Sequence, residues 1–497
     1  MTPPIDQLFA LLKFRTDGEV RELVCVLEAC FSLQQQALEA AERRIVELEA
    51  RVRELEGQLK KDSTNSGKPP SSDGLKRKTR SLREKSGRRQ GGQEGHKGKG
   101  LKFSATPDAI EIVPRKKACE CGGSLHDADV TGVERRQVVD VPKVVPTVTE
   151  YRGERVQCSC CKQEHGAEFP GHVTPGVSYG TNIRAVVLLL LNEHLIPYAR
   201  VAELCEELFG LPVSVGSLVS FQEECFEALE QEEKAIKEEI IQSHTVSFDE
   251  TGVRCEKKTI WCHSASTENS THYAVHEKRG VVAMQEIGIL PRFQGTAVHD
   301  HWSSYFSFSC VHALCNAHHL RELKFLVEVE KESWAQEIAK LLKEALHEVH
   351  VAQGQGALLL SESAQAQIRS RYHGIITAGF GYHASLGEFD AGKEGKQGKK
   401  KQRPGKNLLD RLLNRKDDVL RFIADFRVPF TNNLGERDLR MNKVKQKISG
   451  CFRTLAGARM FCRIRGFIST AKKRGLSVLD VVTKVLSGQA VFAPTGL

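Results

Sequence analysis

The sequence predicts a multidomain α/β protein, and three observations lead to this fold class. Its 497 residues exceed what one hydrophobic core usually organises. A basic stretch and a segment with cysteine pairs divide the N-terminal half into chemically different parts. Further on, four short strand-like runs precede long helical patterns that begin at Ala317, as in an α/β body. The predicted strands are residues 245–248, 258–264, 272–276 and 296–299.

The composition argues against a secreted or membrane protein. The beginning, MTPPIDQLFA, lacks the basic start and apolar core of a signal peptide, and the longest aliphatic run covers only residues 186–191. Fifteen cysteines without a secretion signal indicate reduced thiols or metal ligands rather than a disulfide framework. We therefore expect a reducing cytoplasm and no membrane partner.

The positive charge is concentrated in one segment. The net charge of the chain is +9, and residues 60–100 hold 13 Lys and Arg against 4 Asp and Glu. This segment is rich in Ser, Gly and Pro and cannot form a core, so we predict a disordered linker that contacts a polyanion. The basic side chains that we expect to make this contact are Lys76, Arg77, Lys78, Arg88 and Arg89.

A heptad pattern precedes this linker and predicts a coiled coil. Ile and Val at the first core position with Leu at the second favour a parallel two-stranded coil, so we expect a homodimer or a larger assembly. The alternative is a helix that packs on its own domain. The heptad positions are Leu38, Ile45, Val52 and Leu59, interleaved with Ala41, Leu48 and Leu55.

Residues 106–172 combine alternating Val and Ile patterns with cysteine pairs. The segments AIEIVP, RRQVVDVP and TVTEYRGERVQC are typical of short strands. Four thiolates on two turns suit tetrahedral zinc in a structural site, because no coordination position stays open. The predicted ligands are Cys119, Cys121, Cys158 and Cys161, with Cys160 as a substitute for one of the last two. The alternative is a set of reduced surface thiols without a metal.

Three short helices are predicted next, at residues 183–194, 198–209 and 217–230. A tight Gly210-Leu211-Pro212 break separates the last two, an arrangement that resembles a helix-turn-helix. A second basic, low-complexity stretch follows much later, at residues 392–407, and predicts an exposed loop.

Three acidic residues stand where chemistry is expected. Asp249 follows the first predicted strand and precedes a turn-like Thr251-Gly252 pair, and Asp300 follows the fourth strand. Glu436 lies near the start of a predicted helix. Three carboxylates suit two Mg²⁺ or Mn²⁺ ions, which act together on phosphodiesters.

Basic side chains follow the third acid on the same predicted helix. Arg440, Lys443 and Lys447 come four, seven and eleven residues after Glu436, which places acid and bases along one helical face. From Arg437 to residue 474 there are 12 Lys and Arg and one acid, an imbalance that nucleic-acid phosphates would neutralise.

Several motifs in this order resemble the insertion-sequence-66 family of bacterial transposases. They are DSTNSGKPPSSDG, GGQEGHKGKG, CECGG, SFDETGVR, HDHWSSYF, CNAHHLREL and NNLGERDLRMNKVKQKISGCFR, and they extend from about residue 40 to 475. One departure is Glu94, which stands where the family usually has proline, and it puts in doubt only the local backbone and DNA contact.

The resemblance implies a ribonuclease-H-like mixed sheet with a helical insertion, and a catalytic triad formed by Asp249, Asp300 and Glu436. It further implies strand cleavage and strand transfer at double-stranded DNA, namely the element's terminal inverted repeats and a target. The location would be a bacterial cytoplasm, at the nucleoid. Whether accessory proteins of the same element take part stays open.

Residues beside the triad receive structural interpretations. Glu250 is expected to shape a turn, because successive strand residues point to opposite faces. Trp302 and Tyr305 could stack on an unpaired base, but packing of a helix onto the sheet is favoured. For Cys315, His318 and the adjacent His319 a scaffolding role is favoured over metal ligation.

The predicted domain organisation has six parts. They are an N-terminal helix and coiled coil at 1–62, a basic linker at 63–105, a zinc-binding module at 106–172, a helix-turn-helix-like region at 173–238, a catalytic domain at 239–475 with a helical insertion at about 325–430, and a C-terminal helix and tail at 476–497. Two other functions remain open: a zinc-dependent DNA-binding regulator without catalysis, and a two-metal nuclease that never joins ends.

Overall fold

The computed structural model describes residues 18–61, 65, 91, 93, 95–98, 100–386 and 402–492. The linker residues Lys76, Arg77, Lys78, Arg88 and Arg89, and with them Glu94, lie outside the described residues, as does most of the basic stretch 392–407. The chain divides into two compact units. The larger comprises Met1–Arg80, Ala228–Val481 and Ala490–Leu497, and the smaller comprises Ser81–Glu227 and Val482–Gln489.

The described part of the chain begins with one long helix, α2 (Gly18–Leu59). Its heptad side chains are exposed: Ile45 and Val52 are 56% and 53% exposed, and Leu59 is 77% exposed. A single helix with an exposed apolar seam is compatible with pairing, but pairing itself stays a prediction.

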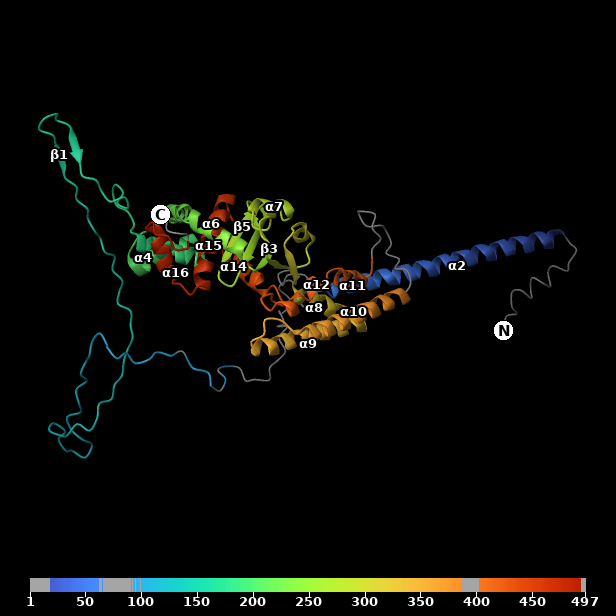
Figure 1. Cartoon of the computed structure of the whole chain (residues 1–497), viewed down its shortest axis with the longest axis horizontal. Helices are drawn as coiled ribbons and strands as arrows, with labels where there is room; N and C mark the ends of the chain where they lie inside the picture. The colour runs from blue at the N-terminus through green and yellow to red at the C-terminus, as the bar shows by residue number, and fades with distance from the viewer. Residues whose placement is uncertain are drawn as a thin grey trace. The chain divides into compact units, whose positions relative to one another are not determined.

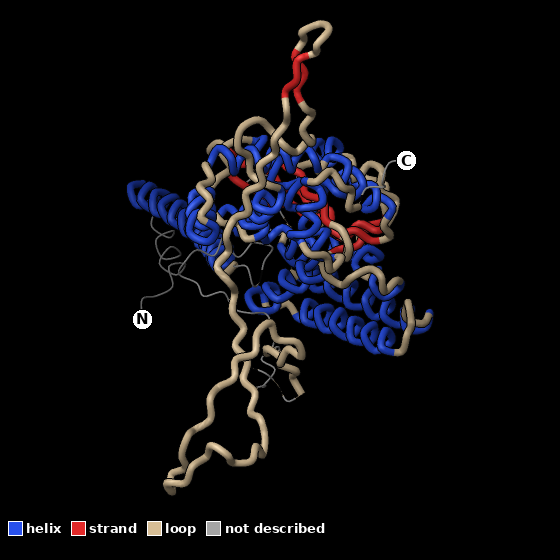
Figure 2. Tube along the Cα trace, turned by 90° about the vertical axis from the view of Figure 1, so that its left-hand side faces the viewer, coloured by secondary structure: helices blue, strands red, loops and turns tan. Residues whose placement is uncertain are grey.

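A five-stranded mixed sheet organises the larger unit (Figure 2). Its strand order is β5-β4-β3-β6-β7; β3 runs antiparallel to β4 and parallel to β6, and β7 is parallel to β6. This mixed α/β arrangement confirms the predicted fold class and is consistent with a ribonuclease-H-like core. The strands are β3 (Thr245–Cys255), β4 (Lys258–Ser266), β5 (Thr271–His276), β6 (Thr296–His299) and β7 (Val311–Leu314).

Helices cover both faces of this sheet (Figure 1). On one face α6 (Glu230–Gln242) and α7 (Val281–Ile287) pack through Ile240 and Met284 onto Val246 and Phe248 of β3. A short 3₁₀ helix, Ser303–Ser307, adds Tyr305 to this layer.

The opposite face is covered by α14 (Asn433–Ser449) and α15 (Leu455–Lys473). Leu439 of α14 and Cys462 of α15 pack against Val253, Cys262 and Tyr273. Because neighbouring residues of a strand point to opposite faces, β3 contributes to both layers in alternation. Asp249 therefore shares its face with Val253, on the side of α14.

The prediction that β3 ends at residue 248 with a turn at Thr251-Gly252 is wrong, because β3 continues to Cys255. Gly252 pairs with Trp261 of β4, and a Cβ there would lie 3.3 Å from Cγ2 of Thr259, so the glycine permits close cross-strand packing. The actual turn lies at Glu256 and Lys257, which have φ angles of +48° and +64°.

A separate helical layer lies between β7 and α14 in the sequence. It begins with α8 (Asn316–Phe325), which continues through a π-helical turn at Leu326–Glu330. These helices share one apolar core that includes Trp334, Tyr372 and Leu409. The others are α9 (Ser333–Gly354), α10 (Glu362–Ser385), α11 (Pro404–Asn414), α12 (Lys416–Val419) and α13 (Arg421–Ala424).

The smaller unit holds the three predicted helices. They are α3 (Thr181–Leu188), which continues as a π-helical turn at Leu189–Glu193, α4 (Tyr198–Phe209) and α5 (Val215–Ala228). Gly210 ends α4 with a φ of +64°, as the predicted break requires. Val201, Cys205 and Leu218 are fully buried in the core that these helices share.

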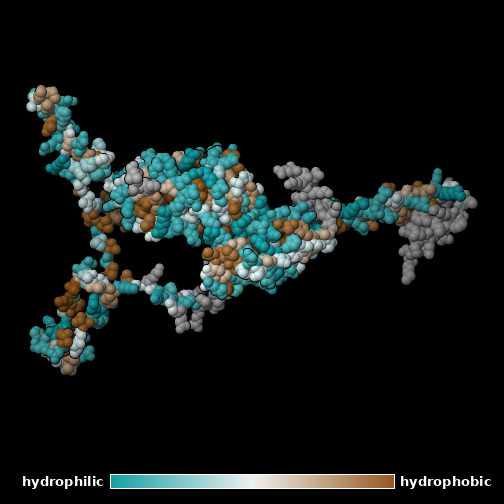
Figure 3. Space-filling model, viewed as in Figure 1, coloured by the Kyte–Doolittle hydropathy of each residue, from teal (hydrophilic) through white to brown (hydrophobic). Residues whose placement is uncertain are grey.

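The segment before these helices contains less strand than predicted. Apart from an isolated antiparallel bridge between Ala118 and Ser124, only β1 (Arg155–Gln157) and β2 (Glu164–Gly166) pair in this described segment, also antiparallel, and AIEIVP and RRQVVDVP form no strand. Their apolar side chains are exposed, for example Ile112 at 91% and Val138 at 94%, and Figure 3 shows such apolar residues on the surface of this segment. Alternation predicts strands only where one face is buried, and here neither face is covered.

The last described helix is α16 (Val478–Leu486). Among the described residues, no helix combines the length and apolar composition that crossing a bilayer requires.

Candidate active site

The register of the parallel strands brings the predicted aspartates side by side. Ser247 of β3 lies opposite Val298 of β6, and β7 continues this row. Two residues further along the same register come Asp249, Asp300 and, after β7, Cys315. Asp249 lies within β3 on the α14 face, whereas Asp300 and Cys315 directly follow β6 and β7, so the three residues lie along the same edge of the sheet.

Asp249 lies where negative charges gather. Its Oδ1 accepts a hydrogen bond from the backbone N–H of Glu250 at 2.9 Å. Burial raises the pKa of Asp249 well above its ordinary value, and the charges of Glu250, Glu436 and Asp300 raise it further. Glu436 and Asp300 are thus among the negative charges that act on Asp249.

Asp300 is held by the backbone directly after it. Its Oδ1 accepts the N–H of Trp302 at 2.9 Å, which fixes one carboxylate oxygen. Burial raises the pKa of Asp300, while this hydrogen bond and the positive charges of Arg279 and Arg411 oppose the increase. The carboxylate is thus positioned by the chain itself.

Glu436 comes from the first turn of α14, and Asn432 anchors that turn. The side-chain amide of Asn432 donates to the Phe248 carbonyl at 2.8 Å, and its backbone N–H donates to Cys315 Sγ at 3.1 Å. Gly435 permits the close approach, because a Cβ there would lie 3.3 Å from the Asp249 Cβ. The helix therefore meets the sheet edge at Asp249 and Asp300, which together with Glu436 form the acidic row.

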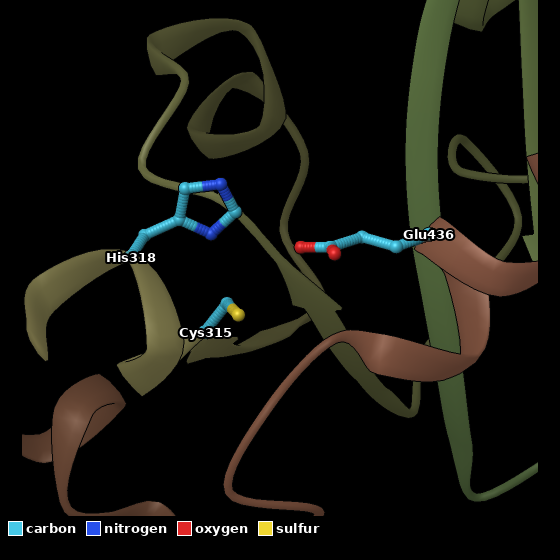
Figure 4. Close-up of side chains that lie close together, drawn as sticks. All are labelled: Cys315, His318 and Glu436. Atoms are coloured by element: carbon cyan, nitrogen blue, oxygen red, sulfur yellow. The ribbon is translucent and has the colours of Figure 1, made fainter. Parts of the chain in front are cut away.

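The Glu436 carboxylate also belongs to a second group of side chains. Within the described ranges, only Cys315, His318 and Glu436 form a set of three His, Cys, Asp or Glu residues with ligand atoms all within 4.8 Å of one another (Figure 4). Asp249, Asp300 and Glu436 do not meet this condition together, although their charges interact. Arg321 lies 3.8 Å from the Glu436 carboxylate.

Glu250 points to the opposite face of β3. It accepts hydrogen bonds from Arg279 Nε and Nη2 at 2.9 and 2.6 Å and from the Tyr305 hydroxyl. Its side chain is only 2% exposed. Glu250 lies within a continuous strand and shapes no turn, so that expectation is wrong, but its separation from the acidic row agrees with the alternation argument.

The aromatic residues after Asp300 take part in packing, as the favoured interpretation held. Tyr305 is 2% exposed, and Trp302 packs against the same cluster. The Arg279 guanidinium lies between two rings, 4.8 Å from the Trp261 centroid and 4.1 Å from that of Trp302. Sequence reasoning missed the roles of Arg279, which lies outside the recognised motifs, and of Asn432, which begins the NNLGERDLR motif but was given no role.

The basic residues of α14 have unequal surroundings. Arg440 and Lys447 are exposed. Lys443 is half-buried and donates to the Gly252 carbonyl at 2.6 Å, and burial lowers its pKa. Thus Lys443 stabilises the packing of α14 on β3, whereas the other two are accessible to a ligand.

The predicted zinc ligands form two separate turns in the smaller unit. Hydrogen bonds from the backbone N–H of Cys121 lower the pKa of Cys119, and those from Cys161 and Cys160 lower the pKa of Cys158. Amide-to-sulfur bonds of this kind favour the thiolate, which is the form that binds zinc. No three of these thiols lie within 4.8 Å of one another, so the zinc site remains a prediction.

The mixed sheet and the acidic row at its edge are typical of phosphoryl-transfer enzymes with a ribonuclease-H-like core. A family model described as "Transposase IS66 family" matches residues 176–460, more than half of the chain. The chain belongs to this transposase family, which confirms the resemblance seen in its motifs. Membership implies DNA transposition by phosphoryl transfer and, as is general for transposases of the Asp-Asp-Glu class, divalent metal ions.

A second family model, described as a family of unknown function, matches residues 18–102. No curated protein matches the chain.

Proposed function

We propose that the chain is a DNA transposase that binds the ends of an insertion element and catalyses metal-dependent strand cleavage and strand transfer. The observation that carries this proposal is the placement of Asp249 within β3 and of Asp300 directly after the neighbouring strand β6, with Glu436 in the first turn of α14, which approaches Asp249 closely at Gly435. Membership in the transposase family supports the same reading.

The proposed metal ligands are Asp249, Asp300 and Glu436. Carboxylate oxygens are hard ligands that suit Mg²⁺ or Mn²⁺, and a bound divalent cation would offset both the burial and the neighbouring negative charges that raise the Asp249 pKa. When bound, two such ions would activate the attacking oxygen and stabilise the leaving oxygen of an in-line displacement.

The protein's own contribution is to orient these carboxylates. The N–H groups of Glu250 and Trp302 each fix one oxygen, on Asp249 and Asp300, and each carboxylate keeps a second oxygen for a cation. Water then attacks the phosphodiester at the element's end, and the freed 3′-hydroxyl attacks the target by the same route. No side chain acts as nucleophile, so no covalent protein–DNA intermediate forms.

Binding of DNA is assigned to several parts. The exposed Arg440 and Lys447 on α14 would contact phosphates beside the acidic row. The cysteine-bearing segment with its structural Zn²⁺, and the helix-turn-helix-like helices, would recognise the terminal repeats, while α2 would pair protomers. The linker residues Lys76, Arg77, Lys78, Arg88 and Arg89 would add phosphate contacts without sequence preference.

The test supplies the protein with the terminal repeats that flank its gene, a target plasmid and Mg²⁺. The proposal predicts cleaved ends and joined products. Cleavage without joined product would favour the nuclease, and binding without cleavage would favour the regulator. Inverted repeats around the gene would be independent support for mobility.

A further inference from the structure

A group of three metal-ligand types lies beside the acidic row. Cys315, which precedes α8, and His318 in its first turn face Glu436 of α14, and their ligand atoms all lie within 4.8 Å of one another. Figure 4 shows the three side chains directed into a common space. They come from two chain segments more than a hundred residues apart.

The surroundings of Cys315 and His318 suit a bound cation. Cys315 is 1% exposed, and its sulfur accepts the N–H of Asn432 at 3.1 Å. Burial raises the pKa of Cys315 to about 11, so the metal-free side chain is the neutral thiol and zinc binding displaces its proton. Nδ1 of His318 is buried and has no hydrogen-bond partner in the protein. A buried polar nitrogen without a partner is unfavourable, and coordination to a metal would satisfy it.

The combination of one sulfur, one nitrogen and one carboxylate oxygen selects the type of metal. Magnesium prefers oxygen ligands alone, whereas zinc accepts thiolate, imidazole and carboxylate together. Three protein ligands leave a fourth zinc position open. We propose that Cys315, His318 and Glu436 bind one Zn²⁺ ion. This site is distinct from Asp249 and Asp300 and from the predicted zinc ligands in residues 106–172.

Binding has a defined proton balance. The Cys315 thiol releases its proton to solvent as the sulfur–zinc bond forms, the neutral His318 ring donates a lone pair, and Glu436 binds as the carboxylate. This assignment replaces the scaffolding role expected from the sequence.

Glu436 belongs both to the proposed zinc site and to the proposed catalytic triad, so zinc binding should affect DNA cleavage. This consequence rests on the proposed function. If Glu436 also holds a catalytic ion, zinc at Cys315 and His318 draws that carboxylate away from Asp249 and Asp300. Zinc then inhibits magnesium-dependent cleavage, and excess magnesium only partly reverses the inhibition. Binding of zinc itself does not depend on catalysis.

The test titrates metal-free, full-length protein with Co²⁺, a spectroscopic substitute for zinc, and compares wild type with Cys315→Ser. The matched control is Cys310→Ser, because Cys310 is also buried and lies at the other end of β7. Metal bound by the cysteine module is common to all samples and cancels in the difference.

Cys315→Ser is expected to bind one equivalent less Co²⁺ than wild type and to lose one thiolate-to-cobalt charge-transfer contribution, while Cys310→Ser matches wild type. Equal stoichiometry and equal spectra in wild type and Cys315→Ser would overturn the site. His318→Gln, with folding checked by circular dichroism, must show the same loss of one equivalent. Asp249→Asn must keep the thiolate-to-cobalt charge-transfer contribution that depends on Cys315, whatever its cleavage activity and its metal content at the carboxylates, so failure of the zinc site and failure of the proposed function are separate results.

Discussion

The two faces of the central strand treat neighbouring carboxylates in opposite ways. On the α7 face, Glu250 is matched within the protein by Arg279 and the Tyr305 hydroxyl. On the α14 face, Asp249 accepts a backbone N–H and lies among the negative charges of Glu436 and Asp300. Burial raises the pKa of both carboxylates, but Glu250 has a cationic partner in Arg279, whereas Asp249 is surrounded by like charge and is suited to a bound cation.

The largest effect should come from removing the charge on the α14 face. Asp249→Asn keeps the size of the side chain but removes a proposed metal ligand, so we expect cleavage to fall by roughly 10³-fold or more, about 4 kcal/mol in barrier. Binding of element ends should change little, because other parts carry it. Single-turnover cleavage and a gel-shift assay on the same preparation measure both, and persistent cleavage would remove Asp249 from the triad.

A third buried carboxylate, Glu332 in the helical layer, should make the stability of the protein depend on pH. Glu332 accepts the Trp334 indole N–H at 2.6 Å and lies 3.1 Å from His383, and burial raises the pKa of Glu332 to about 7. The folded state therefore keeps a proton that the unfolded state releases. Burial of Glu332 therefore does not affect the free energy of unfolding below about pH 4.5. Its destabilising effect grows as the pH rises toward 7 and is then constant.

Glu332→Gln removes the loss of stability that accompanies the rise in pH from about 4.5 to 7. Relative to wild type, the variant should gain up to about 3 kcal/mol above pH 7 and nothing below about pH 4.5, since one pKa unit corresponds to about 1.4 kcal/mol. Denaturant unfolding at several pH values measures the difference. A gain independent of pH would mean that the proton on Glu332 is not the cause.

Glu250→Gln tests the neutralised face. It leaves Arg279 without its charged partner, and because that guanidinium is 38% exposed we expect a moderate loss of about 1–3 kcal/mol in the free energy of unfolding. Cleavage per folded molecule should fall far less than in Asp249→Asn. If the two variants lost cleavage equally, the distinction between the faces would be wrong.

The smallest effect is expected on the exposed part of α14. Arg440→Ala should weaken DNA binding by less than about tenfold and reduce the salt dependence by roughly one phosphate contact. Lys443→Ala is the matched comparison, because its ammonium already donates to the Gly252 carbonyl and should affect stability instead. Binding isotherms at several salt concentrations separate the two, and identical salt slopes in wild type and Arg440→Ala would exclude the contact.

Much of the sheet could be predicted because short strands with one apolar face leave a clear pattern. The fourth predicted strand coincides with β6, whereas β3 extends past the predicted end because Gly252 meets Thr259 and Trp261 across the sheet. A glycine can indicate either a turn or a strand position that packs closely against a neighbouring strand, and the sequence alone does not distinguish these two cases. The four residues of β7 were too few to give a pattern.

The site was predictable only in part. Asp249 and Asp300 could be proposed because each follows a short apolar run, although Asp249 itself lies within β3, and Glu436 could be proposed because it lies near the start of a helix. The grouping of Cys315 and His318 with Glu436 could not be found, since it depends on Asn432 anchoring α14 to β3 and to the Cys315 sulfur. Contacts between segments so far apart in sequence leave no local pattern.

The most direct test of the central claim is a Mn²⁺ titration of full-length protein, with free Mn²⁺ followed by electron paramagnetic resonance. The account predicts that wild type and Glu250→Gln bind two ions per chain at the acidic row, and that Asp249→Asn loses this binding or weakens it at least tenfold. Equal stoichiometry and affinity in wild type and Asp249→Asn would contradict the assignment of Asp249, Asp300 and Glu436 as the metal-binding triad.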